Sequence, residues 1–239
     1  PDVTWETSEQ FNIGLDARMI GGHLNVNLDY YIKTTKDWLV TAPVLATVGT
    51  GAPTINGGDV KNKGFEFNLV WNDMIGKDFR YNIGFNGAYN KNEVGSIPTD
   101  DGIIHGATNQ LYDNAPEFYR AQNGHAIGYF WGYKTAGIFQ NQQEINEWIS
   151  NGNGVLQADV KPGDVKYYDI NHDGQINDDD KVDLGNGMPD FTYGFTLGFD
   201  WKGLDFSVQA NGAAGQKIVQ TYRNHANAQA NYTTEILQR

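Results

Sequence analysis

The side chains best suited to chemistry are the oxygen-bearing residues of an acidic segment at positions 169–180. Carboxylate or amide residues stand at positions 1, 3 and 5 of this segment, glycine stands at 6, and Asp180 stands at 12, as in the EF-hand calcium loop. Hard oxygen ligands suit Ca²⁺ better than transition metals. The spacing therefore predicts a structural calcium site. The predicted ligands are Asp169, Asn171, Asp173, Gln175 (through its carbonyl) and Asp180.

The flanks of this acidic loop do not resemble an EF-hand. Residues 166–168 (Lys-Tyr-Tyr) indicate a strand where an EF-hand has a helix. EF-hand loops end in Glu, and the shorter Asp180 reaches an ion less easily with both oxygens, so weak affinity is expected. The alternative is an acidic turn held without metal by side-chain hydrogen bonds to its own backbone. No paired second loop is present, so a calcium switch is not expected.

An aromatic run at residues 129–133 is the second candidate site. Its aromatic side chains have the flat faces that stack on sugar rings, and Tyr129, Trp131 and Tyr133 are the substrate- or partner-binding candidates. The alternative, which we favour, is the small core of a lobe, because large aromatic side chains usually bury their area. A short helix is expected at residues 143–149.

Catalytic chemistry is not predicted. The five histidines are scattered without HExxH spacing, and no nucleophile elbow or phosphate-binding loop is present. The sequence has no cysteine, which excludes disulfides and cysteine-based zinc sites. A formal charge of −12 argues against nucleic-acid binding. We therefore expect neither an enzyme nor a nucleic-acid-binding protein.

The elements that must position these residues are strands, because apolar and polar residues alternate with period two. In each segment the apolar residues form one face and small or polar residues form the other. The segments are residues 11–19, 24–33, 64–71, 79–86, 191–201 and 204–211.

Two folds explain this alternation. In a soluble β-sandwich the apolar face packs on a second sheet. In a transmembrane β-barrel it faces lipid, with the polar face toward the lumen. Strands of about 9–11 residues match a bilayer crossing, whereas soluble strands usually have about 5–6. Aromatic residues lie near the strand ends, and short turns alternate with long connections, both of which favour the barrel.

We expect no membrane-crossing strand within residues 92–189. Within that stretch we expect residues 127–139 to pair with residues 164–169.

The chain resembles the SusC/RagA-type TonB-dependent outer-membrane transporters of Bacteroidetes. The similarity extends in order over nearly the whole chain. It is carried by residues 1–6 (PDVTWE), 11–16 (FNIGLD), 29–35 (DYYIKTT), 62–66 (NKGFE), 128–140 (GYFWGYKTAGIFQ), 185–194 (GNGMPDFTYG) and 233–239 (TTEILQR).

This resemblance implies an all-β fold, namely a six-stranded antiparallel section of a 22-stranded transmembrane β-barrel with long extracellular loops. Six strands cannot close a barrel, so we expect a piece of the C-terminal half of a longer transporter. Residues 1–91 are expected to hold barrel strands and one long outer loop. Residues 92–189 form an extracellular lobe with the acidic loop, residues 190–213 a barrel hairpin, and residues 214–239 the start of a further outer loop.

The resemblance also implies a function. Such transporters import glycans, or less often oligopeptides, across the bacterial outer membrane. They work with a SusD-like surface lipoprotein and take energy from the TonB complex through a plug that this sequence lacks. Expected partners are therefore that lipoprotein, the TonB complex, the substrate and outer-membrane lipid. The alternative is a soluble carbohydrate-binding β-sandwich module with a structural calcium loop.

Overall fold

A computed structural model describes residues 3–41, 53–112 and 114–220 of the chain. The chain divides into two compact units, which are described separately below. The first unit comprises Pro1–Ile104, Ala121–Tyr129 and Gly185–Lys217. The second comprises His105–Arg120, Phe130–Leu184 and Ile218–Arg239.

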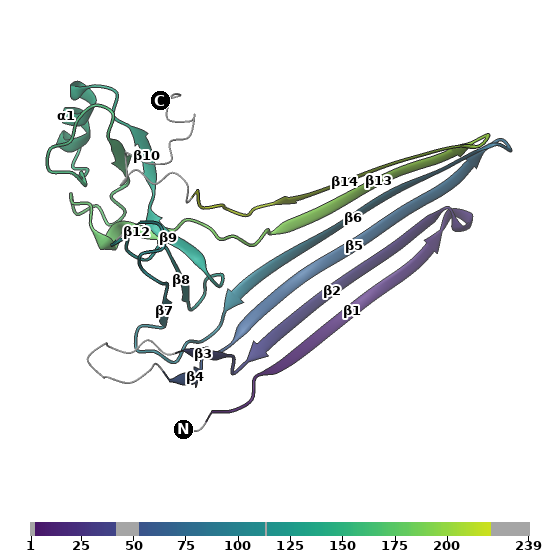
Figure 1. The fold of residues 1–239 in the computed structure, drawn as a ribbon, viewed down its shortest axis with the longest axis horizontal. Helices are drawn as coiled ribbons and strands as arrows, with labels where there is room; N and C mark the ends of the chain where they lie inside the picture. The colour runs from purple at the N-terminus through teal and green to yellow at the C-terminus, as the bar shows by residue number, and fades with distance from the viewer. Residues whose placement is uncertain (1–2, 42–52, 113, 221–239) are drawn as a thin grey trace. The chain divides into compact units, whose positions relative to one another are not determined.

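The first unit is built on an antiparallel sheet of six strands, in the order β1-β2-β5-β6-β13-β14 (Figure 1). The strands are β1 (Thr7–Met19), β2 (Leu24–Lys36), β5 (Val60–Ile75), β6 (Phe79–Val94), β13 (Phe191–Trp201) and β14 (Leu204–Ala214). All six predicted segments are therefore confirmed as strands. Several are longer than predicted, and β5 and β6 have 16 residues each.

Three short turns close the three hairpins of this sheet. Lys202 and Gly203 connect β13 to β14 with φ angles of 50° and 87°, as a two-residue turn that matches the twist of its strands requires. A single turn of 3-10 helix, η1 (Ile20–Gly22), connects β1 to β2, and residues 76–78 connect β5 to β6. The three turns lie at one end of the sheet (Figure 1).

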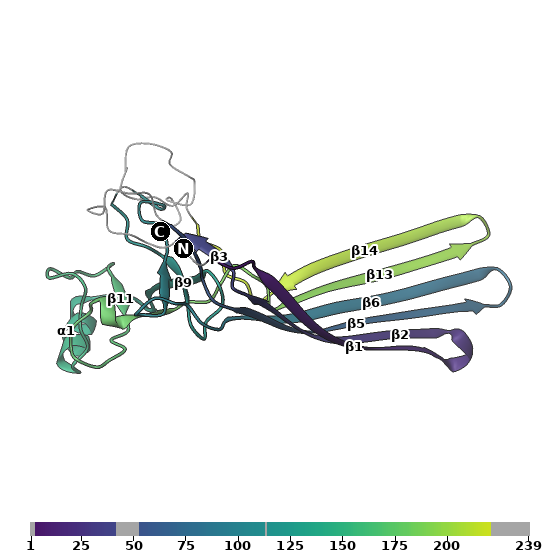
Figure 2. The same cartoon turned by 90° about the horizontal axis from the view of Figure 1, so that it is seen from below.

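The two faces of the sheet differ as the alternation predicts. Cross-strand rows on the apolar face include Leu69–Phe85–Phe195 and Ile83–Leu197–Val208. Phe85 and Phe195 on this face are 39% and 38% exposed. In Figure 2 the six strands form a single layer.

The buried apolar side chains of the described residues lie elsewhere. Only Val60 and Val94, at strand ends, belong to this sheet, and Val94 packs with Ile97 and Ala121. Among the described residues, no second sheet packs on the apolar face, as the barrel interpretation predicts and unlike the soluble sandwich. A short hairpin, β3 (Leu39–Thr41) with β4 (Thr54–Asn56), lies in the connection between β2 and β5.

Short elements occupy the connection between β6 and β13. They are β7 (Ile103–His105), β8 (Tyr119–Gln122), β9 (Tyr129–Tyr133), β10 (Thr135–Ile138), α1 (Gln142–Ser150), β11 (Val165–Tyr167), η3 (Asp178–Asp180) and β12 (Lys181–Asp183). The sheet order is β12-β9-β8-β7, and β10 pairs with β11. The longest described strand here has five residues, too few to cross a bilayer.

Two local predictions in this region are confirmed. Helix α1 covers the expected residues 143–149 and extends by one residue at each end. The Asn141 side chain caps it by accepting a hydrogen bond from the Glu144 amide. The pairing of residues 127–139 with 164–169 is found between β10 and β11, whereas β9 pairs with β12. Within the described part of the chain, no helix has the length and hydropathy of a membrane-spanning segment.

Candidate functional site

The polar face of the six-stranded sheet carries a row of three amide side chains and one carboxylate. Asp16, Asn27, Asn68 and Asn86 stand opposite one another across four strands. The Asn27 amide donates to Asp16 Oδ1 at 2.5 Å, and the Asn68 amide donates to Asn27 Oδ1 at 3.1 Å. Gly194 stands opposite Asn86, and a Cβ there would lie 2.7 Å from Asn86 Oδ1. We call these four residues the amide row.

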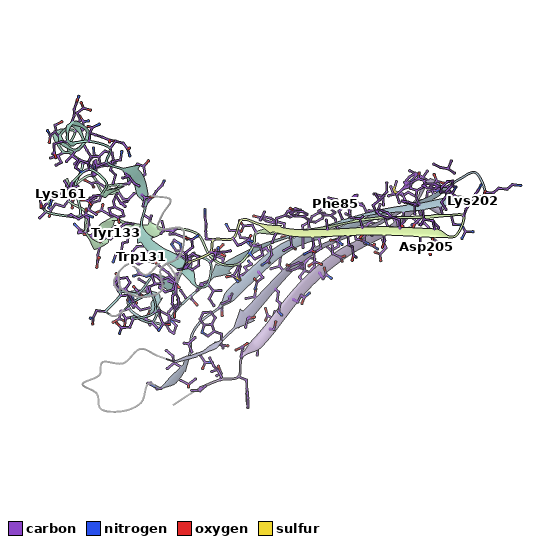
Figure 3. All side chains as sticks on the ribbon, turned by 45° about the horizontal axis from the view of Figure 1, so that its top comes forward. Phe85, Trp131, Tyr133, Lys161, Lys202 and Asp205 are labelled. Carbon is purple, nitrogen blue, oxygen red and sulfur yellow. The ribbon has the colours of Figure 1, made fainter. Side chains whose placement is uncertain are left out.

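Two shallow hollows lie along this row. One of about 320 Å³ is lined by Asn27, Asn68 and Asn86, together with Asp29 and Glu66. The other, of about 510 Å³, lies toward β14 and is lined by Thr192, Gln209, Asn211 and their neighbours. Amide and hydroxyl groups both donate and accept hydrogen bonds. The carboxylates of Asp29 and Glu66 only accept them. This surface therefore suits uncharged ligands that offer hydrogen-bond donors, such as sugar hydroxyls or peptide amides. Figure 3 labels Phe85 and Asp205, which lie on opposite faces of the sheet.

The aromatic run predicted from the sequence lies largely on β9, and its side chains are packed. Tyr129 has no exposed surface, its ring stacks on His125 at 4.5 Å, and its hydroxyl donates to Gln122. This burial prevents any contact with a sugar ring at the surface. The expectation of a packing role therefore holds for Tyr129.

Trp131 and Tyr133 keep partial exposure (Figure 3). The guanidinium of Arg120 lies 4.1 Å from the Trp131 ring centroid, a cation–π contact that occupies one face of the indole. The Tyr133 hydroxyl donates to Asp178 at 3.4 Å. Burial and then the negative charge of Asp178 raise the pKa of Tyr133. Each ring thus has a partner from the second unit.

A charged cluster around Glu117, which was not predicted from the sequence, lies beside Trp131. Glu117 accepts hydrogen bonds from Arg120, from a ring nitrogen of His105 and from the Gly106 amide. Burial raises the pKa of Glu117, but the hydrogen bonds and charges of His105 and Arg120 outweigh it, so the net pKa is lowered. His105, Glu117 and Arg120 follow no recognised motif spacing, and their contact depends on how the short elements of this connection pack.

The acidic loop is a compact turn in which the carboxylates hold backbone amides. Asp169 and Asp180 are 3% and 0% exposed. The Asp169 carboxylate accepts from the amides of Asp173 and Gly174 at 3.2 and 2.7 Å. The Asp180 carboxylate accepts from those of Ile170 and Asn177 at 2.8 and 2.9 Å.

The remaining predicted ligands lie at the tip of this loop. Asp173 accepts from the Gln175 amide at 2.8 Å and from the Asn171 side chain at 3.1 Å. Gly174 has φ of +80°, and Ile176 is buried, as a loop of this pattern requires. Nowhere in the described residues do three His, Asp or Glu side chains form a metal-binding group. The hydrogen bonds seen here fit the metal-free turn, and the calcium site stays a prediction.

Comparison with known proteins identifies the family. The sequence profile of the family described as "TonB dependent receptor-like, beta-barrel" matches residues 1–236. The chain belongs to the TonB-dependent receptor family. The predicted family and the all-β barrel fold are thus confirmed, although the six strands do not close into a barrel. Members of this family are outer-membrane proteins.

Relatives of this TonB-dependent receptor chain extend well beyond it. TonB-dependent receptor P3 of Formosa agariphila is 29% identical over 99% of the chain, which covers 23% of that protein. TonB-dependent receptor SusC of Bacteroides thetaiotaomicron is 24% identical, and the chain covers 22% of it. The solved structure of the RagAB peptide transporter matches 90% of the chain and 22% of its own, with a TM-score of 0.67 and 24% identity. The chain therefore spans less than a quarter of the length of these relatives.

The comparisons support the class of protein and do not test the predicted site residues. The relatives are named as receptors and transporters, in agreement with the expected class of protein. The resemblance at residues 233–239 and most of the segment 214–239 lie outside the described residues.

Proposed function

We propose that this chain forms part of the wall, and one outer lobe, of an outer-membrane transporter that imports neutral oligomers. The observation that carries the proposal is the one-sided sheet, whose apolar face is exposed along strands of 11–16 residues. Such a face is costly in water and requires a covering of low polarity. Lipid supplies that covering around a barrel, and the polar face then borders the lumen.

The dimensions of the apolar face support this placement. On β6 it runs from Tyr89 to Phe79, an interval of about 33 Å at roughly 3.3 Å per residue. A strand tilt of about 40° reduces this interval to about 25 Å along the membrane normal, the usual height of the apolar band. Aromatic residues mark both of its ends, Phe65 and Tyr89 at one and Phe79 and Trp201 at the other.

The direction of insertion follows from the connections. Outer-membrane barrels have short periplasmic turns and long outer loops. The turn between β13 and β14 is therefore periplasmic, as are the other two hairpin turns. Residues 92–189 begin and end on the outer side and form an extracellular lobe. A SusD-like surface lipoprotein would dock on that side and close over the lumen.

The substrate is a glycan or an oligopeptide, and the amide row is its contact surface in this part of the lumen. Of the relatives reported above, RagAB is described as a peptide transporter, whereas the name of SusC states no substrate. The amide row suits either substrate because sugar hydroxyls and peptide amides both donate hydrogen bonds, which its amide and carboxylate oxygens accept. The TonB complex would drive import through a plug encoded elsewhere in the full transporter.

The acidic loop is proposed as a structural calcium site of the lobe. Asp169 and Asp180 are buried, and no ion pair with either is found among the described residues. Burial of a carboxylate is costly unless hydrogen bonds or a cation compensate it. The backbone amides supply part of that compensation, and Ca²⁺ prefers the same oxygen donors.

Cysteine labelling of the full transporter on intact cells tests the placement. The chain has no native cysteine, and any cysteine elsewhere in the transporter is first replaced by serine, so a membrane-impermeant maleimide reports only introduced thiols. Ala158 is exposed in the lobe, whereas Lys77 is exposed in the β5–β6 turn. Ala158→Cys should react on intact cells, and Lys77→Cys only after the outer membrane is permeabilised. The reverse pattern would exclude the proposed direction of insertion.

Uptake assays test the function itself. Cells that depend on the full transporter are given labelled oligosaccharides or oligopeptides, with and without a functional TonB protein. Replacing Asn68 and Asn86 by Leu should lower uptake of the true substrate while leaving the amount of assembled protein unchanged. Uptake that does not depend on TonB, or that is equal in the variant and the wild type, would contradict the proposal.

A further inference from the structure

Two lysines stand directly opposite each other on the apolar face of the sheet. Lys63 on β5 pairs with Lys91 on β6, and both side chains are exposed. Like charges directly opposite each other in an antiparallel pair are destabilising. Among the residues that the structure describes, neither lysine forms an ion pair. We call these two residues the lysine pair.

The neighbouring lysines on this face differ from the lysine pair. Lys36 forms an ion pair with Glu9 at 2.8 Å, and Lys61 stands opposite Glu93. Carboxylates are therefore available one row further out, but none is opposite Lys63 or Lys91. The whole chain is strongly acidic, with a formal charge of −12. A site for two positive charges without a carboxylate is thus a local exception that calls for an external anion.

The position of the lysine pair relative to the apolar band indicates which kind of anion would bind there. The row directly below it on the same face is Phe65 and Tyr89, the aromatic border of the band. Two residues along a strand rise about 6.6 Å, or about 5 Å along the membrane normal at a tilt of about 40°. The headgroup layer extends roughly 5–7 Å beyond the hydrocarbon on each side of a bilayer. The lysine pair therefore lies at headgroup depth.

The opposite face at this level is different. There the side chains of Tyr31, Asn62, Asn90 and Asn92 form a hydrogen-bonded group. Lys33 lies on this polar face, across from Asn62. Charged residues that serve only solubility have no reason to lie, without ion-pair partners, on the same face as the apolar band. The asymmetry indicates a ligand that approaches from the lipid side.

The geometry points to a binding site for the phosphate groups of outer-leaflet lipid at Lys63 and Lys91. This inference rests on the proposed function, which places the apolar face in the membrane and this end of the strands outside. One phosphate bridges the two ammonium groups, and the acyl chains lie along Phe65, Tyr89 and the apolar residues below them. The ligand class is a phosphorylated lipid such as lipid A, held by its headgroup charge and by its chains together.

Binding of lipid to the full transporter tests this inference. The purified protein in neutral detergent is titrated with lipid A, with lipid A from which the phosphates were removed, and with inorganic phosphate. Each basic residue near an anionic membrane surface contributes about a fivefold change in affinity. Lys63→Gln with Lys91→Gln should therefore weaken binding of phosphorylated lipid A roughly thirtyfold. Binding of the dephosphorylated lipid should not change.

Matched controls separate charge and position. Lys33→Gln removes a lysine of similar exposure at the same level on the polar face, and it should leave lipid binding unchanged. Lys63→Arg with Lys91→Arg keeps the charge and should restore the affinity. An equal loss in Lys33→Gln, no loss in the double Gln variant, or binding of inorganic phosphate as tight as that of the lipid would overturn the inference.

A separate flotation experiment tests the proposed membrane placement independently of lipid A binding. Wild-type transporter should float with neutral lipid vesicles, as should the double Gln variant, because the apolar band is unchanged. Flotation with no change in lipid A affinity would reject the lysine site alone. A wild-type protein that does not associate with either neutral or lipid A vesicles would reject the membrane placement and the lysine site with it.

Discussion

Replacement of Leu197 by Arg is expected to destabilise the assembled barrel by about 2–4 kcal/mol, the cost of arginine near the bilayer midplane on a lipid-facing strand. Leu197 stands between Ile83 and Val208 on the apolar face. It is about 20 Å along β13 from the outer aromatic Phe191 and about 13 Å from Trp201 at the other border. At a tilt of about 40° its Cα lies within about 3 Å of the middle of the band.

The measurement is the folding equilibrium of the full transporter in lipid vesicles, followed by tryptophan fluorescence during guanidinium titration. The expected loss corresponds to about 30- to 700-fold in the equilibrium constant. Thr196→Arg is the matched control, because Thr196 is the next residue on β13 and lies on the polar face between Gly84 and Gln209. It should cost less than about 1 kcal/mol. If the Thr196 variant is as unstable as the Leu197 variant, the assignment of the two faces is refuted.

Three further predictions concern other parts of the chain. Ca²⁺ should raise the thermal stability of the lobe in the full transporter, and Asp169→Ala with Asp173→Ala should abolish this effect; equal stabilisation of variant and wild type would leave the metal-free turn as the explanation. Glu117→Gln should weaken the protection of β8 against hydrogen exchange at neutral pH. Folding lowers the pKa of Glu117. Its contribution to stability is therefore present above the ordinary glutamate pKa and is lost as the pH falls through the lowered pKa of the folded state. The Gln variant should lack this acid-dependent loss of protection, and a parallel decline in both proteins would disprove this role of Glu117. Gly64→Ala should destabilise the sheet by about 1–3 kcal/mol because the new methyl group meets the Tyr31 ring, whereas Gly84→Ala, whose nearest neighbour atom is Thr196 Cβ at 3.6 Å, should be almost neutral; similar unfolding midpoints for the two variants would contradict this.

Strand positions and face assignments could be predicted from the sequence because each depends on local alternation. The registers within hairpins are local too, since short turns fix which residues stand opposite each other. The pairing of Asp16 with Asn27, and of Asn68 with Asn86, follows from the turns that connect their strands. The lysine pair could have been found in the same way, by counting outward from residues 76–78.

Contacts across long connections could not be predicted in this way. The register of β2 against β5, which brings Asn27 to Asn68, is set across residues 37–59 and has no local signal. Similarly, the contact of Arg120 with Trp131 depends on how a mixed set of short elements packs. The acidic loop shows a different limit. Its spacing predicted a calcium site, and the same carboxylates accept hydrogen bonds from backbone amides. Spacing alone does not distinguish these two partners.

The three hairpin turns also bear on how such a wall assembles. A turn of two to four residues aligns its two strands within microseconds, so each hairpin can reach its own register before it meets another. Joining the hairpins then means closing the connections between β2 and β5 and between β6 and β13. The second connection is about four times longer, yet loop-closure entropy rises only with the logarithm of length, so the difference is about 1.3 kcal/mol. Folding of the lobe itself offsets part of this difference. The unit of assembly is thus the hairpin, and a large insertion at the outer end has little effect on the cost of adding the next one.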